Sequence, residues 1–77
     1  MTRDEMIVFL MGNPYVHITH FLFDDSEYIY STNDGKVYDE NGYLFEDWDS
    51  VSNNWSGHNG IRSRVGGQWE TGWRIKK

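Results

Sequence analysis

The fold is decided by residues 27–46, which read EYIYSTNDGKVYDENGYLFE. The stretch opens with tyrosine, isoleucine and tyrosine in alternation, a pattern that places every second side chain on the same face of a β-strand. Two turns follow, at Asn33-Asp34-Gly35 and Asn41-Gly42, because these residue types accept the positive φ that tight hairpin turns need. We therefore expect an antiparallel meander of three short strands, at residues 27–32, 36–40 and 43–46.

The N-terminal side of this stretch predicts a helix followed by a strand. Thr2 stands three residues before Glu5, the spacing of a capping box, and Gly12 is a typical helix end. A helix is therefore expected at about residues 3–11, and the β-branched and aromatic residues 15–23 predict a central strand. The apolar face of the helix is expected to consist of Met6, Phe9 and Leu10, widened by Ile7 and Met11.

The C-terminal side predicts a loop and a last hairpin. Residues 47–60 are rich in Ser, Asn and Gly and show no periodicity, so a loop is expected there. Residues 61–65 and 69–76 both alternate, with Gly66-Gly67 as the turn between them. The expected architecture is a single small α+β domain over residues 1–77. One N-terminal helix packs on an antiparallel sheet of five or six strands, a meander plus the C-terminal hairpin.

Charge is divided unevenly along the chain. Residues 1–60 hold eleven of the twelve acidic residues and two of the seven basic ones, a net −9, whereas residues 61–77 hold five basic residues and Glu70, a net +4. The whole chain has a formal charge of −5. Two hypotheses follow: the basic part neutralises acidic neighbours across the sheet, or the acidic part meets a basic partner.

No set of residues indicates catalysis or a metal site. The carboxylates fall mainly at predicted turns, where solvent opposes strong pKa shifts, and no serine lies in the glycine pattern of a nucleophile elbow. His17 and His20 are three apart on a predicted strand and so face opposite ways, which favours packing over metal binding. We therefore expect a non-enzymatic protein with no metal and no cofactor.

The acidic and aromatic residues predict a surface for binding a partner protein. The carboxylates recur along the meander at intervals that hairpin ends can align, which would let them imitate the phosphates of a nucleic acid. Tryptophan and tyrosine are typical anchors of protein interfaces. A partner with a basic, nucleic-acid-binding groove would fit such a surface. The candidate contact residues are Asp34, Asp39, Glu40, Glu46, Asp47, Trp48, Asp49 and Trp55.

Over its whole length the chain resembles small accessory proteins encoded by tailed bacteriophages. The resemblance rests on PYVHITH at residues 14–20 with Phe23, on DENGYLFEDW at 39–48 and on GGQWETGW at 66–73. It implies a protein that binds and blocks a host or defence protein in the host bacterial cytoplasm, an anti-CRISPR inhibitor in its most concrete form. It implies no catalytic residue.

Two other functions stay open. A phage structural or assembly protein would use the same sheet to form a homo-oligomer. A small nucleic-acid or ligand-binding module would use Trp69 and Trp73 in the basic tail, because bases stack on aromatic rings beside arginine. The net negative charge makes direct nucleic-acid binding the weaker hypothesis. The apolar run at residues 6–11 is too short to cross a bilayer, so no membrane contact is expected.

Overall fold

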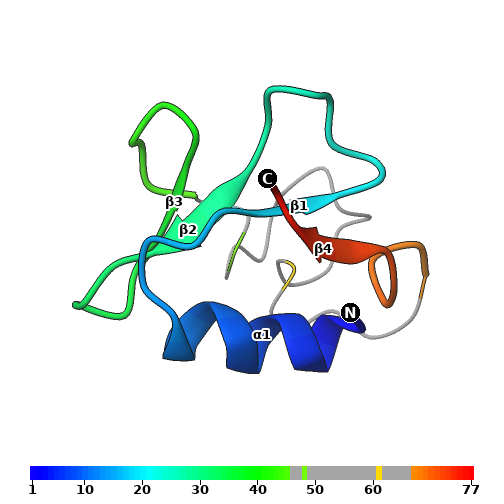
Figure 1. The fold of residues 1–77 in the computed structure, drawn as a ribbon, viewed down its shortest axis with the longest axis horizontal. Helices are drawn as coiled ribbons and strands as arrows, with labels where there is room; N and C mark the ends of the chain where they lie inside the picture. The colour runs from blue at the N-terminus through cyan, green and yellow to red at the C-terminus, as the bar shows by residue number, and fades with distance from the viewer. Residues whose placement is uncertain (46–47, 49–60, 62–66) are drawn as a thin grey trace.

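The structure is a computed structural model that describes residues 1–45, 48, 61 and 67–77. Figure 1 shows one helix below a twisted antiparallel sheet of four strands. The α+β class expected from the sequence is therefore confirmed. The elements are α1 (Arg3–Gly12), β1 (Ile18–His20), β2 (Ile29–Ser31), β3 (Val37–Asp39) and β4 (Trp73–Ile75).

Helix α1 begins where the capping box predicts. The Thr2 hydroxyl accepts a hydrogen bond from the Glu5 backbone N–H at 3.2 Å, and the Glu5 carboxylate accepts one from the Thr2 backbone N–H at 2.9 Å. Two donors that a helix start leaves free are thereby satisfied. The helix predicted at residues 3–11 is confirmed, and it ends one residue later, at Gly12.

The strands lie in the order β3-β2-β1-β4, and all neighbours are antiparallel. β1, β2 and β3 form a meander, with Ile18 opposite Ile29 and Tyr30 opposite Tyr38. β4 returns to the other side of β1, where Trp73 is opposite His20. β1 therefore lies between β2, which follows it directly in sequence, and β4, which is the last strand, and it pairs with both.

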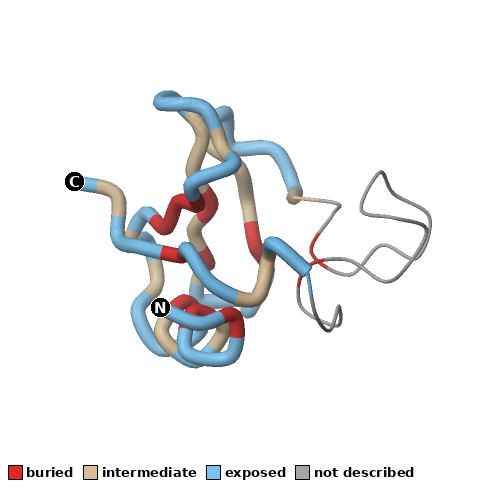
Figure 2. Tube along the Cα trace, turned by 90° about the vertical axis from the view of Figure 1, so that its right-hand side faces the viewer, coloured by how far each residue is buried: buried red, intermediate tan, exposed pale blue. Residues whose placement is uncertain are grey.

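The core lies between α1 and one face of the sheet. In Figure 2 the buried segments gather on the facing sides of these two layers. Removing apolar side chains from water is the main favourable term in such a small fold. A buried polar contact adds to it, because the Ser31 hydroxyl donates a hydrogen bond to the Leu10 carbonyl oxygen. The buried apolar residues are Met6, Leu10, Ile18, Ile29, Val37, Trp48, Ile61 and Trp73.

The strands of the meander are shorter than the sequence predicted. The strand expected at residues 15–23 is limited to Ile18–His20, because the Phe23 N–H bonds back to the His20 carbonyl oxygen and turns the chain. The strand expected at residues 43–46 is reduced to one isolated bridge between Leu44 and Tyr38. The described residues therefore form four strands, and the expected five or six are not confirmed.

The expected C-terminal hairpin is only partly observed. Of residues 69–76, only Trp73–Ile75 form a strand. The residues before it turn instead, and their Gln68 and Thr71 carbonyl oxygens are bonded to the side chain of His20 in β1. Most of the other predicted strand, at residues 61–65, lies outside the described residues, as do the Gly66 turn position and most of the expected loop.

Candidate functional site

Helix α1 covers one face of the sheet, and no described helix covers the opposite face. Ile18, Ile29 and Val37 lie on the covered face, so the residues that alternate with them lie on the opposite side, which we call the outer face. Extending the observed register by one residue gives two rows across the four strands. These rows are Tyr38, Tyr30, His17 and Lys76, and Glu40, Tyr28, Thr19 and Arg74.

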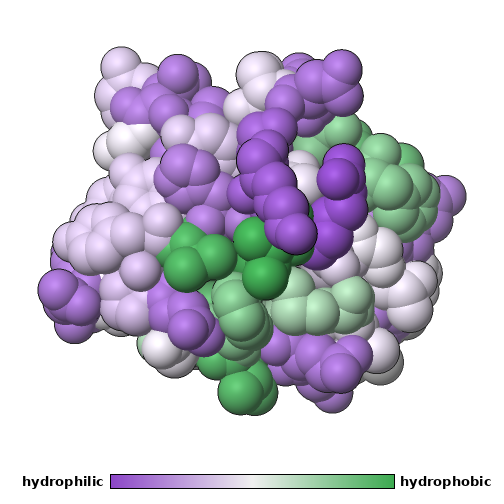
Figure 3. Space-filling model, viewed as in Figure 1, coloured by the Kyte–Doolittle hydropathy of each residue, from purple (hydrophilic) through white to green (hydrophobic). Residues whose placement is uncertain are grey.

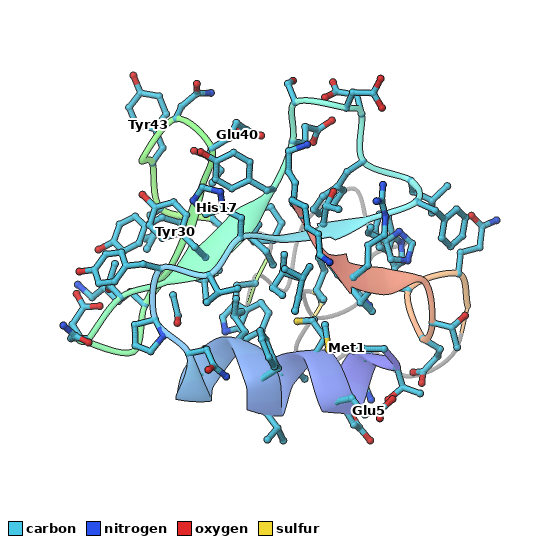
Figure 4. The ribbon with its side chains drawn as sticks, viewed as in Figure 1. Met1, Glu5, His17, Tyr30, Glu40 and Tyr43 are labelled. Atoms are coloured by element: carbon cyan, nitrogen blue, oxygen red, sulfur yellow. The ribbon has the colours of Figure 1, made fainter. Side chains whose placement is uncertain are left out.

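The aromatic rings on this side of the sheet are stacked on one another. The rings of His17 and Tyr28 are nearly parallel, with centroids 3.9 Å apart and planes inclined by 14°. Tyr30 stacks on Tyr38 at 6.0 Å and on Tyr15 at 6.2 Å. Figure 4 shows His17 and Tyr30 on this side with Glu40 and Tyr43 above them. All five stacked rings are exposed or half-buried, so they form an ordered aromatic surface.

Carboxylates gather at one end of the sheet. The turn between β1 and β2 and the turn after β3 both lie at the top of Figure 1. The predicted row of acids is therefore only partly brought together, because Asp34 lies in the turn at the opposite end of β3. The acids at this shared end are Asp24, Asp25, Glu27, Asp39 and Glu40.

Glu40 is the member of this acidic group that belongs to the outer face. Burial raises the pKa of its carboxyl group, and the neighbouring charges of Asp39 and Glu27 raise it further. Like charges held close together disfavour ionisation because each one destabilises the others. This corner therefore has a concentrated negative potential that a cation would relieve.

Asp34 and Asp39 also hold their own turns. The Asp34 carboxylate accepts from the Lys36 backbone N–H at 3.0 Å, and the Asp39 carboxylate accepts from the Asn41 backbone N–H at 2.9 Å. A hydrogen bond from the Thr32 hydroxyl, followed by the one from Lys36, lowers the pKa of Asp34. Side-chain acceptors of this kind stabilise tight turns, so these two acids have a structural role.

The opposite end of both rows is basic. Arg74 is exposed, and Lys76 donates from Nζ to the Asp25 carbonyl oxygen at 2.6 Å. At the start of α1, Nε of the buried Arg3 lies 3.4 Å from Oε1 of Glu70. The Arg3–Glu70 pair joins a basic residue of the acidic segment to the acidic residue of the basic segment, so it does not reduce the charge contrast between the two segments. In Figure 3 hydrophilic side chains cover much of the view, and apolar side chains run from its centre to its lower edge and also lie at its upper right.

The predicted contact residues divide into three groups. Asp34, Asp39 and Glu40 lie at the surface or are half-buried, at the two ends of β3. Trp48 was expected to be an exposed anchor, but it packs in the core and is only 6% exposed, because an apolar ring of this size is more stable out of water. The remaining predicted contacts lie outside the described residues: Glu46, Asp47, Asp49 and Trp55.

Sequence reasoning did not include the tyrosines in the site. The signal was present, because Tyr28 and Tyr30 alternate with the apolar Ile29 and must share a face opposite to it. The alternation could not show that Tyr38 pairs with Tyr30, since the register depends on the turn at residues 32–36.

The two histidines do not meet. His17 is exposed and stacked on Tyr28, whereas His20 is buried among aromatic rings. Within the part of the chain that the structure describes, no three His, Asp or Glu residues are placed to hold a metal ion. Helix α1, the one helix in that part, is too short to span a membrane.

A shallow hollow along α1 is a weaker candidate site. It is lined by residues that include Met1, Glu5, Val8 and Phe9, and Figure 4 shows Met1 and Glu5 at one end of the helix. The Glu5 carboxylate already caps the helix, and the hollow is wide open to solvent. Ligand sites are typically concave with convergent polar groups, so the outer face is the better candidate.

Comparison with models of protein families, with curated proteins and with solved structures found no match. The site is therefore interpreted from its own geometry.

Proposed function

We propose that the chain is a non-enzymatic protein that binds a partner protein through the outer face and the acidic end beside it. The observation that carries this proposal is the stack of five exposed or half-buried rings next to the Glu40 corner. Large rigid aromatic side chains give contact area at a low cost in conformational entropy. Because these rings are already packed together, less freedom remains to be lost on binding.

The stacking geometry favours a protein over a base or a sugar. A base or sugar ring needs the open face of an aromatic side chain, but His17 and Tyr28 turn faces toward each other. These two faces are therefore closed to a ligand, and the tyrosines offer hydroxyl groups, which suit polar protein contacts. The tryptophans proposed for a nucleic-acid module do not offer a platform either, since Trp73 is 1% exposed and Trp69 is half-buried.

The charge distribution favours a basic partner. Five carboxylates share the acidic end of the sheet, and the whole chain carries −5. Complementary charge steers encounter and suppresses wrong partners. The resemblance to phage accessory proteins supports a finer form of the proposal. In that form, the chain occupies a basic groove of a host or defence protein in the bacterial cytoplasm and inhibits it, as an anti-CRISPR protein does.

A matched pair of charge reversals tests the proposal. Glu40→Lys changes the proposed contact surface, whereas Asp4→Lys makes the same charge change on α1, where the Asp4 side chain is 84% exposed. Wild type and both variants are immobilised and exposed to bacterial lysate, and phage plating is measured on cells with an active CRISPR system. We expect wild type and Asp4→Lys to capture the same protein and raise plating, and Glu40→Lys to lose both effects.

Two outcomes would contradict the proposal. If Glu40→Lys captures the partner as well as wild type does, the outer face is not the contact. If wild type captures nothing and leaves plating unchanged, the inhibitory function is wrong. Circular dichroism of each variant shows whether the fold is retained.

A further inference from the structure

The outer face has opposite charges at its two ends. One row across the strands begins at Glu40 on the β3 side and finishes at Arg74 on the β4 side, with Tyr28 and Thr19 between them. The second row begins at Tyr38 and finishes at Lys76. Three interstrand spacings separate the ends, about 14 Å. The rows therefore change from the Glu40 carboxylate and aromatic rings to basic side chains over the width of the sheet.

This polarity makes the face complementary to itself under one particular symmetry. A two-fold axis parallel to the strands, lying above the outer face, turns a second copy over and exchanges its left and right sides. Glu40 of each copy then lies over Arg74 of the other. A two-fold axis perpendicular to the strands would instead place like charges together. Two-fold interfaces require self-complementary surfaces, and the first arrangement meets that requirement.

The centre of the face suits contact between sheets. The stacked rings of His17 and Tyr28 lie between the charged ends, beside Tyr30. Thr19 is already buried beneath its neighbours and donates its hydroxyl to the Glu27 carbonyl oxygen, so this hydroxyl keeps its partner when the face is covered. Sheets pack face to face with their strands within about 30° of each other, which is compatible with this axis.

We propose that the outer face is a docking surface for a second copy of this chain, with Glu40 of each copy over Arg74 of the other. The occupant is identified by charge complementarity, because the chain supplies both halves of the match. This dimer does not depend on the proposed function. A second step does rest on it: the Arg74 end of the second copy takes the place of a basic partner, so dimer and partner complex exclude each other.

Charge-swapped variants test the dimer directly. Sedimentation velocity from about 10 µM to about 1 mM covers the range of weak self-association. Wild type is expected to form dimers that dissociate at high salt, because exposed charge pairs are screened. Glu40→Lys and Arg74→Glu each place like charges together and are each expected to raise the dimer dissociation constant at least about tenfold. Asp4→Lys, on α1, is the control and is expected to dimerise as wild type does.

The decisive sample is an equimolar mixture of the two single variants. In a mixed dimer, Lys at position 40 of one copy meets Glu at position 74 of the other, and the native Arg74 and Glu40 meet at the second contact. The mixture is therefore expected to dimerise more tightly than either variant alone, a result that misfolding of either variant cannot produce. A wild type that stays monomeric throughout, single variants that dimerise normally, or a mixture that stays monomeric would each overturn the proposal.

Discussion

Nε2 of His20 lies 2.7 Å from the carbonyl oxygen of Thr71 and 3.1 Å from that of Gln68. Because both neighbours are acceptors, this nitrogen must carry the proton. The other ring nitrogen, Nδ1, accepts a hydrogen bond from the Leu22 backbone N–H at 3.1 Å. The buried ring is therefore held in one neutral tautomer, and it fixes the turn before β4 to the end of β1.

The stability of the fold should fall as His20 becomes protonated. Burial lowers the pKa of His20, while its hydrogen bonds to Thr71 and Gln68 oppose this shift. The folded state therefore binds this proton less readily than the unfolded state, whose ordinary pKa is 6.5. The stability that neutral His20 contributes is complete above pH 6.5 and is lost as the pH falls below it. The free energy of unfolding then decreases with a limiting slope of about 1.4 kcal/mol per pH unit. Urea denaturation between pH 8 and pH 5 measures this loss.

Substitution of His17 provides the control for substitution of His20 in this experiment. His20→Gln should remove the pH dependence between pH 7 and pH 5, whereas the exposed His17→Gln should keep it. The carboxylates with lowered pKa values, including Asp24 and Asp34, change the stability only at more acidic pH, below about 4.5. An unchanged slope in His20→Gln would mean that another group is responsible.

Gly72→Ala should destabilise the fold more than an equivalent change in an open turn. Gly72 has φ +90°, and a Cβ there would lie 2.3 Å from Cδ1 of Phe21. Gly35 has a similar φ, +79°, but a Cβ there meets nothing. Both variants should lose about 1 kcal/mol from backbone strain, and Gly72→Ala should lose about 1–3 kcal/mol more through the collision.

Urea denaturation of both glycine variants, with and without Phe21→Ala, separates the two effects. Removing the Phe21 ring should recover the additional loss in Gly72→Ala and leave the Gly35→Ala loss unchanged. Equal losses for the two glycines would show that the Phe21 ring moves aside freely.

Thr2→Ala should lower the free energy of unfolding by about 1 kcal/mol, because the Glu5 N–H loses its acceptor at the start of α1. Thr2→Ser keeps the hydroxyl and should stay close to wild type. Chemical denaturation measures both values. Equal stability of the two variants would mean that the capping hydrogen bond contributes nothing.

Ser31→Ala should lower the free energy of unfolding by about 1–2 kcal/mol, because it leaves the buried Leu10 carbonyl oxygen without this donor. Ser26 provides the comparison, since it is exposed and donates only to Asp24 in its own turn. Ser26→Ala should change stability by less than about 0.5 kcal/mol. Thermal melting distinguishes the two cases, and a neutral Ser31→Ala would show that the Leu10 carbonyl finds another donor.

Local signals in the sequence predicted the local structure well. Thr2 and Glu5 predicted the helix start because both capping partners lie within one turn of each other. Gly35 and Gly42 predicted their turns because each needs a positive φ, and both have it, at +79° and +80°. In these places the energy that decides the conformation comes from neighbouring residues, so the sequence is enough.

Features that depend on distant residues were not predictable in the same way. The segment before β4 was expected to be part of a long strand, but it turns and is held by the His20 ring through Gln68 and Thr71, which no local pattern reveals. Trp48 could not be placed in the core by alternation, since its burial depends on the packing of several elements. The candidate site was found only in part for the same reason. The acidic residues could be identified from the sequence, but the strand register that places them beside the tyrosines could not.

The position of β4 has a consequence for how the chain folds. Its Trp73 pairs with His20 and completes the core, although the two residues are 53 positions apart in a chain of 77. Contacts so distant in sequence require closure of a long loop and slow the folding reaction. During synthesis, α1 and the first three strands emerge before the residue that closes their core. Until Trp73 arrives, the nascent chain should expose the apolar surface of Met6 and Leu10 and be most vulnerable to aggregation and proteolysis.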